Sequence, residues 1–160
     1  MASALSGDSD AAPSYFWAAV AWGKFALAVG KLEAARAGAA QKVRDYALSV
    51  AAIDPAFEEG GGYRLLGRLH DQAPWIPFLT GWVSRRTAVK NLRLAVAVNA
   101  RNFVNRHFLA EALARGGPAA RAEATVIEEG LLAEVASPAH LVEELAIQDE
   151  ARRNLATWRK

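Results

Sequence analysis

One pattern recurs at the same place in three helix-length segments of this chain, and it restricts the fold more than any other feature. A large apolar residue precedes a small one at Trp22-Gly23, Leu66-Gly67 and Leu109-Ala110, and these sites lie 44 and 43 residues apart. The small residue lets a neighbouring helix approach closely. The recurrence predicts three helical hairpins followed by a closing helix, which is the plan of an α-solenoid. The second segments of the three hairpins end at Asp54-Pro55, Asn99-Ala100 and Ser137-Pro138.

Composition supports an all-α fold. Alanine dominates, and Ala, Leu, Arg and Glu all favour helices, whereas β-branched runs of strand length are missing. At 160 residues we expect one domain with a sizeable core. We expect residues 1–12 to be disordered and residues 13–160 to form a single helical domain.

Proline, glycine and asparagine set the limits of seven predicted helices. The predicted ranges are Pro13 to about Val29, Ala39 to Ile53, Tyr63 to Gln72, Arg85 to Val98, Phe103 to Arg115, Ala119 to Val135, and Pro138 to Trp158. Between the second and third helices, Gly60-Gly61-Gly62 is expected to act as a hinge-like turn.

The segment between the third and fourth helices, residues 73–84, is called the connector. Pro74 and Pro77 exclude a regular helix there. Its composition is nevertheless apolar, and loops that run over a surface are normally polar. We therefore expect the connector either to pack into the core or to wall a pocket for an apolar ligand as well. The large apolar side chains are those of Trp75, Ile76, Phe78, Leu79 and Trp82.

The middle hairpin resembles a tetratricopeptide repeat. The resemblance in the first helix is carried by Tyr63, Leu66, Gly67 and His70, and in the second helix by Ala88, Leu92, Ala95 and Ala100. The proline that usually ends the second helix is missing here but present in the flanking hairpins. The period exceeds that family's 34 residues by roughly ten, and in this hairpin the connector supplies the extra length. The resemblance implies a tetratricopeptide-like domain over residues 13–160.

A narrower resemblance covers residues 13–159. The segments 62–70, 73–82 and 105–111 resemble the T component associated with TRAP-type uptake systems. The resemblance implies a periplasmic lipoprotein, anchored at the outer membrane, that contacts a substrate-binding protein or transporter subunit and passes hydrophobic or anionic ligands. The lipidated cysteine of such proteins is absent from this chain, so either the chain starts after it or this is a soluble relative.

Mapping the repeat onto the chain places a mostly cationic set of side chains on a concave face. An arginine fork can bind a carboxylate, and neighbouring aromatic side chains could bury an apolar body. The alternative interpretation is that these charges only solvate the groove and pair with one another. The predicted ligand-binding residues are Trp17, Lys24, Tyr63, Arg64, Arg68, Trp75, Phe78, Trp82, His107 and Glu111, with Val20, Asp71 and Arg115 nearby.

Charge is distributed unevenly along the chain. Residues 85–121 hold eight Lys and Arg and one acid, whereas residues 122–150 hold eight acids and no Lys or Arg. Blocks of opposite sign and equal size favour pairing within the chain or head-to-tail between copies in a homo-oligomer. No nucleic-acid reader motif accompanies the basic block, so no nucleic-acid partner is predicted. We expect Glu128, Glu129, Glu143 and Glu144 to lie on solvated helix faces.

No motif of catalysis is present. The chain lacks cysteine, a phosphate-binding loop, a dinucleotide fingerprint and a recognisable Ser/His/Asp arrangement. His107 and Glu111, with His70, are weak candidates for a metal site, and none is predicted. We therefore predict a non-enzymatic protein without a cofactor.

The leading functional hypothesis is a periplasmic helical-repeat protein that binds or passes a hydrophobic or amphipathic molecule beside a transporter. A lipid, a sterol-like molecule or a hydrophobic organic acid would suit it. The alternative is a protein–protein adaptor of tetratricopeptide type without a small-molecule ligand. A third hypothesis is a cytosolic scaffold unrelated to transport.

Overall fold

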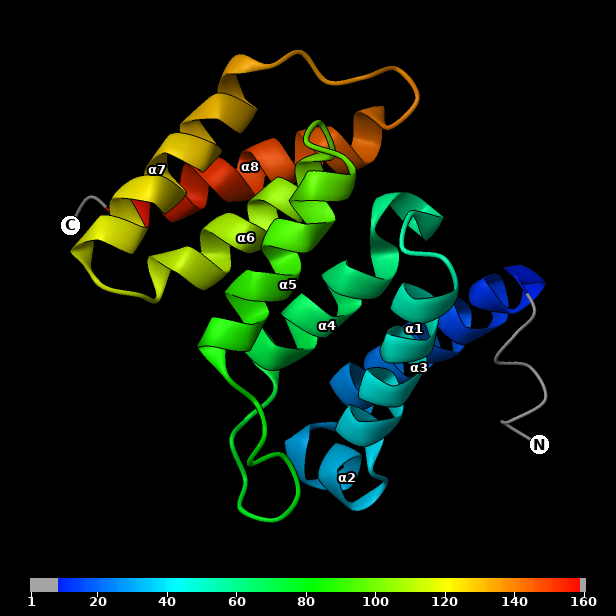
Figure 1. Ribbon diagram of the computed structural model, residues 1–160. Coiled ribbons are helices and arrows are strands. Elements are labelled where there is room, and N and C mark those ends of the chain that lie inside the picture. Colours follow the sequence, from blue (N-terminus) through cyan, green and yellow to red (C-terminus); the bar gives the residue numbers. More distant parts are fainter. Residues whose placement is uncertain (1–8, 159–160) are drawn as a thin grey trace. The chain divides into compact units, whose positions relative to one another are not determined.

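The structure, a computed structural model, describes residues 9–158 and is helical (Figure 1). No strand occurs among these residues, so the predicted all-α class is confirmed. The chain divides into two compact units, residues 1–98 and 99–160.

In unit 1, helices α1, α3, α4 and α5 pack in chain order, each on the next. The short helix α2 joins α1 to α3. Much of the buried interior consists of alanine, including Ala19, Ala47 and Ala88, which keeps the helix axes close together. The elements are η2 (Ser9–Ala11), α1 (Ala12–Val29), α2 (Lys31–Arg36), α3 (Ala39–Ile53), η3 (Phe57–Glu59), α4 (Gly61–Gln72) and α5 (Arg85–Val98).

Unit 2 contains three helices, α6 (Phe103–Ala114), α7 (Pro118–Ala133) and α8 (Leu141–Trp158). Each of them packs against the other two. Phe103, Leu131 and Ile147, one from each helix, form a buried apolar cluster. Asn102 caps α6, because its side-chain oxygen accepts a hydrogen bond from the backbone N–H of Asn105.

The helix limits follow the predicted ones closely, with α3 and α5 at the predicted residues. The main difference is α2, because no helix is predicted between Val29 and Ala39. Gly30 and Gly38 flank α2 with φ of 82° and 66°. These left-handed conformations suit glycine and allow a single short helix between two turns.

The N-terminal prediction is partly wrong. Residues 9–12 were expected to lack structure, but they form the 3-10 turn η2 and the start of α1, and Ala11 and Ala12 are buried. Residues 1–8 and 159–160 lie outside the described part of the chain.

The small residues of the recurring pattern do not all play the same role. A methyl group added to Gly67 would lie 2.4 Å from Leu92 Cγ and 3.2 Å from the Ala88 carbonyl oxygen, so α4 and α5 do approach closely there. Ala110 is fully buried. At Gly23, in contrast, an added methyl group would meet nothing within 4 Å, so the expected close approach is absent at this position.

The triple glycine is a packing feature rather than a hinge. Gly60, with φ of 85°, precedes α4, and Gly61 and Gly62 form its first turn. A methyl group on Gly62 would lie 2.8 Å from the backbone nitrogen of Ala51, and one on Gly61 would lie 2.6 Å from the Phe16 ring. These glycines let α4 start directly against α1 and α3.

None of the helices among the described residues combines the length and the apolar character that a membrane crossing requires.

Candidate functional site

The connector is an ordered loop held by hydrogen bonds within itself. The Thr80 hydroxyl donates to the Pro74 carbonyl and accepts from the Ile76 N–H at 2.9 Å. The Trp75 indole N–H donates to the Gly81 carbonyl at 3.1 Å. The Thr80 side chain is buried, so a polar residue, not an apolar one, forms the centre of this loop.

Three of the five large apolar side chains of the connector are exposed, whereas Ile76 and Trp82 are half-buried. Trp75 is 64% exposed, Leu79 is 52% exposed and Phe78 is fully exposed. The expectation that this segment packs into the core is therefore wrong for these three residues. The Trp82 indole N–H donates to the Leu79 carbonyl at 3.1 Å, so both indoles of the connector are hydrogen-bonded to its own backbone.

Trp82 fixes the base of the connector to unit 1. The His70 ring meets the Trp82 ring edge-on, with centroids 5.2 Å apart, and the Arg44 guanidinium lies 4.6 Å from the centroid of Trp82. His70 Nδ1 accepts a hydrogen bond from the Ser84 N–H at 3.2 Å. Trp82 thus ties one end of the connector to α3 and α4, whereas Phe78 and Leu79 at its tip are exposed.

The neutral form of His70 is favoured in this position. Burial, followed by the positive charge of Arg44, lowers the pKa of His70 below its ordinary value. A neutral ring leaves the Nδ1 lone pair available to accept from Ser84.

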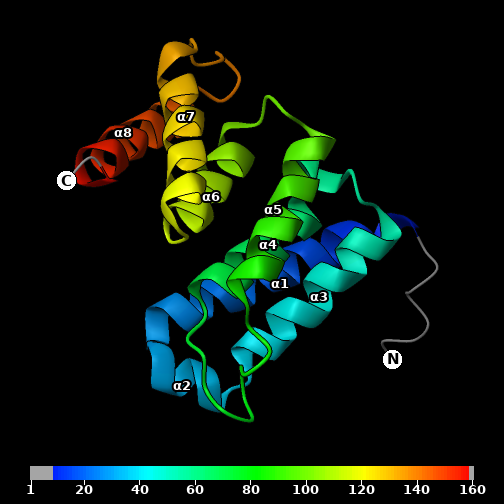
Figure 2. The ribbon, with the colours of Figure 1, turned by 60° about the vertical axis from the view of Figure 1, so that its left-hand side comes forward.

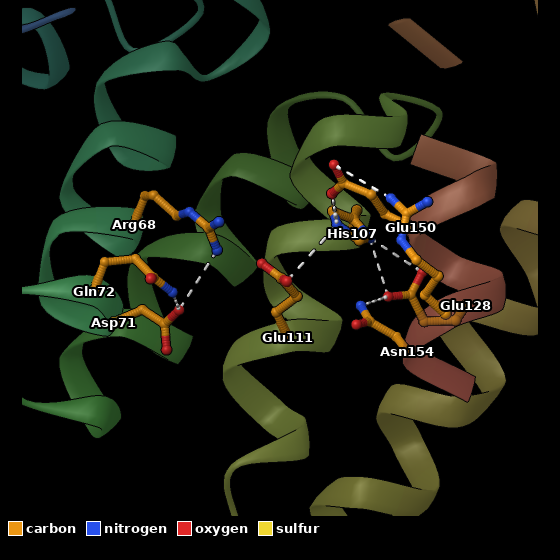
Figure 3. A network of polar contacts seen from close by, with 9 residues as sticks. Arg68, Asp71, Gln72, His107, Glu111, Glu128, Glu150 and Asn154 are labelled. Carbon is orange, nitrogen blue, oxygen red and sulfur yellow. Dashed lines mark hydrogen bonds and ion pairs between the residues drawn. The ribbon is translucent and has the colours of Figure 1, made fainter. Parts of the chain in front are cut away.

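The other predicted groove residues of unit 1 are spread over α1 and α4. Trp17 is largely exposed and packs edge-on against the Phe16 ring, and Lys24 is exposed. Tyr63, Arg64 and Arg68 of α4 are half-buried. Arg68 lies 3.6 Å from the carboxylate of Asp71 one turn along (Figure 3), as the charge-pairing interpretation expects.

In unit 2, the predicted residue His107 is not on an open face but completely buried. Its Nδ1 lies 3.0 Å from a carboxylate oxygen of Glu128 on α7, and its Nε2 lies 3.0 Å from Glu150 on α8 (Figure 3). Glu111 is 4.0 Å from Nε2. The Asn154 side-chain amide donates to Glu128 at 3.1 Å. We call these residues the His107 network.

The carboxylates of the network favour a protonated imidazole. Burial alone would lower the pKa of His107, but the hydrogen bond to Glu128 and the negative charges of Glu128, Glu111 and Glu150 outweigh it. The pKa of His107 therefore lies above its ordinary value. An imidazolium can donate from both nitrogens at once, so one ring joins α6 to α7 and α8.

This geometry suits cohesion between helices better than catalysis or metal binding. Glu128 and Glu150 bind opposite edges of the imidazole, whereas metal ligands converge on one point. Among residues 9–158, no group of three or more His, Asp or Glu side chains is arranged to hold a metal ion.

Glu128 and Glu144 correct the expectation of solvated acidic faces. Glu128 is fully buried, and Glu144 is 8% exposed and accepts a hydrogen bond from the Ser137 N–H at 2.5 Å. The sequence did carry a signal for Glu128. It lies on the same face of α7 as the buried residues Ala124 and Leu131, at helical spacing, and a carboxylate within an apolar stripe requires a partner.

The predicted pairing between basic and acidic blocks occurs inside unit 2. Arg106 makes a bidentate contact with Glu134, at 2.6 and 2.9 Å, and this hydrogen bond lowers the pKa of Glu134 below its ordinary value. The Gln148 side-chain amide donates to the Leu131 and Glu134 carbonyls at the end of α7. Polar groups therefore tie α8 and α6 to the end of α7.

A hollow of about 360 Å³ lies at the start of α7, and none of the predicted binding residues lines it. Its lining residues are Gly116, Pro118, Arg121, Ala122, Thr125 and Trp158. Comparison of the chain with protein-family models, with curated proteins and with solved structures finds no match.

Proposed function

We propose that this protein is a non-enzymatic binding module, and that the tip of the connector recognises amphipathic molecules of the lipid class. The observation that carries the proposal is the outward presentation of Trp75, Phe78 and Leu79 by a loop with a fixed backbone. Exposing large apolar side chains in this way carries no benefit for folding. A preformed loop also loses little conformational freedom on binding.

The shape of the tip favours a lipid assembly over an isolated small ligand. Small-molecule sites are concave and enclose most of their ligand, whereas Phe78 projects fully into solvent. A projecting apolar side chain can be buried by entering another apolar phase, such as the acyl region of a lipid aggregate. This proposal keeps the ligand chemistry expected from the sequence and moves the contact from a groove to a tip.

We further propose that the helix pairs α1/α3, α4/α5 and α6/α7 are tetratricopeptide-like repeats closed by α8. What supports this is the packing of each pair and the recurring large–small pattern. We also propose that the protein acts beside a periplasmic uptake system. What supports this is the resemblance of residues 62–70, 73–82 and 105–111 to the T component associated with TRAP-type systems.

A micelle titration tests the binding proposal. Adding dodecylphosphocholine to the full chain should shift the tryptophan emission to shorter wavelength once micelles form, because Trp75 leaves water. The variant Trp75→Phe should still bind but should show a smaller shift.

Two double variants form a matched pair. The tip variant carries Phe78→Asn and Leu79→Ser, and the unit 2 variant carries Val126→Asn and Val142→Ser. All four side chains are exposed, and Asn tolerates the φ of 62° at position 78. The tip variant should bind micelles about tenfold more weakly, and the unit 2 variant should bind like the parent chain. The proposal is contradicted if the tip variant binds micelles as tightly as the parent chain. It is also contradicted if the parent chain does not bind micelles, whether or not it binds a protein partner.

A further inference from the structure

The connector shares one end of unit 1 with the segment that contains α2. In Figures 1 and 2, the connector, α2, the last turns of α1 and the first turns of α3 and α5 all lie at the same end of this unit. The contact of Arg44, near the start of α3, with Trp82 ties the connector to α3 at this end. We call this region the connector end.

Exposed apolar side chains at this end are not confined to the connector. Leu27, near the end of α1, is 87% exposed, and Leu32 of α2 is largely exposed. Together with Trp75, Phe78 and Leu79 they place apolar groups on two separate segments at the same end of the unit.

The same end carries a strong positive charge. Residues 24–44 and 73–90 contain eight Lys and Arg and one acid, Glu33, which lies 3.8 Å from Arg36. Two further acids border these ranges, Asp45 on α3 and Asp71 in the last turn of α4, where Asp71 pairs with Arg68. Lys31, Arg85 and Arg86 are exposed. The whole chain has 19 basic and 17 acidic residues, so positive charge is concentrated here rather than general.

From this juxtaposition we propose that the connector end is a docking surface for an anionic lipid bilayer, with Phe78 and Leu79 inserted among the acyl chains and the surrounding Lys and Arg at the headgroups. This inference rests on the lipid recognition proposed above and specifies that the lipid is an anionic bilayer. Trp75 would lie at the interface, because an indole combines an apolar ring with a polar N–H and is enriched at that depth.

Charge complementarity favours a bilayer as the occupant. Basic side chains near an anionic leaflet are attracted to it within a Debye length, and they need no individual partners. The basic residues of the connector end lie on α1, α2, α3 and α5, which suits a broad charged surface more than a single pocket. Peripheral attachment of this kind requires two weak signals, and both are present.

Co-sedimentation of the full chain with vesicles tests this inference. The vesicles are phosphatidylcholine alone, or phosphatidylcholine and phosphatidylglycerol in equal parts. The parent chain should bind the mixed vesicles at least about tenfold more tightly than the neutral ones, and added salt should weaken the binding.

Two variants separate the apolar and electrostatic contributions. Phe78→Asn with Leu79→Ser should weaken binding to the mixed vesicles about tenfold, and Arg85→Gln with Arg86→Gln should also weaken it and reduce its salt dependence. The charge-matched control is Arg152→Gln with Arg153→Gln, which removes two exposed arginines from α8 and should leave binding unchanged.

The outcomes distinguish this inference from the proposal on which it rests. If the chain binds dodecylphosphocholine micelles but not mixed vesicles, the bilayer inference is wrong and lipid recognition stands. If it binds neither, both are wrong. Equal binding to neutral and mixed vesicles, or equal weakening by the α8 control, overturns the role of the connector end. The role is also overturned if the chain binds no vesicles and instead binds a protein partner through Phe78.

Discussion

His107 shows how one buried residue can organise a whole unit. Its imidazole is fully buried, yet both nitrogens lie 3.0 Å from carboxylate oxygens on two other helices. Removing one partner from a buried charged pair costs more than the pair contributes, because the remaining charge keeps its desolvation penalty. We therefore expect the network to be intolerant of single substitutions.

Glu128→Gln should lower the free energy of unfolding by about 1–3 kcal/mol, because a hydrogen bond to a charged group is lost in a buried position. The pKa of His107 should fall in the same variant, since Glu128 supplies its strongest favourable contact. Urea denaturation and the NMR titration of the His107 ring measure the two effects. Glu129→Gln is the control, since it makes the same change at an exposed position of α7; equal losses in both variants would contradict the account.

The stability of the chain should also depend on pH through His107. A folded-state pKa above the ordinary value of about 6.5 means that the stabilisation is fully present below that pH. It is lost as the pH rises through the pKa of the folded state. The denaturation midpoint should therefore fall on the alkaline side, and His107→Gln should remove this dependence. A denaturation midpoint of the parent chain that rises with pH over the same range would contradict this prediction.

His70 should show the reverse dependence. Its pKa is lowered, so its contribution is present above the ordinary value of about 6.5 and is lost as the pH falls through the folded-state pKa. A protonated ring could no longer accept the Ser84 N–H. The NMR signal of the Ser84 amide should move on acidification, together with the signal of the His70 ring. A Ser84 signal that stays fixed while His70 titrates would contradict this.

At the residue scale, the sequence alone identified His107 and Glu111 as neighbours but not their environment. Their spacing of four residues brings them onto one helix face, and the structure finds them 4.0 Å apart. Glu150 and Asn154 come from α8, more than 40 residues after His107 in the chain. Local spacing cannot show a contact that depends on how three helices pack.

At the scale of elements, small residues decide how closely helices approach, and the two glycines of the recurring pattern differ in this respect. Gly67 faces Leu92 and the Ala88 carbonyl, whereas Gly23 faces open space. A side chain can adjust, but the backbone carbonyl of a packed helix moves much less easily.

Gly67→Ala and Gly23→Ala should therefore have opposite effects. The first should destabilise the chain by about 1–3 kcal/mol through overpacking, and the second should stabilise it by about 0.5–1 kcal/mol, because alanine loses less backbone entropy in a helix. Thermal or urea denaturation of the two variants provides the comparison. A neutral or stabilising Gly67→Ala would show that α4 and α5 are not in close contact.

Helix limits were predictable because prolines, glycines and caps are local signals. The limits of α3 and α5 match the predicted residues. The short helix α2 was missed, because Lys31–Arg36 is too short to show a hydrophobic period. The glycine triplet was misread as a hinge, since its tight contacts with Phe16 and Ala51 come from segments distant in the sequence.

At the scale of the whole molecule, the two units differ in where their polar and apolar side chains lie. Buried polar groups stabilise unit 2, whereas the connector of unit 1 exposes apolar side chains on a fixed loop. The apolar composition of residues 73–84 was visible in the sequence, but the sequence did not show whether these side chains face the core or the solvent. Thr80, a small polar residue, is buried and hydrogen-bonded within the loop, while Trp75 and Phe78 are exposed.

The measurement that tests this account most directly is paramagnetic broadening of backbone amide signals by a lipid spin-labelled in its acyl chain, in dodecylphosphocholine micelles. The account predicts the strongest broadening at Phe78 and Leu79, less at Leu27 and Leu32, and little in α7. Uniform broadening over both units, or broadening that is strongest in unit 2 and spares the connector, would contradict it.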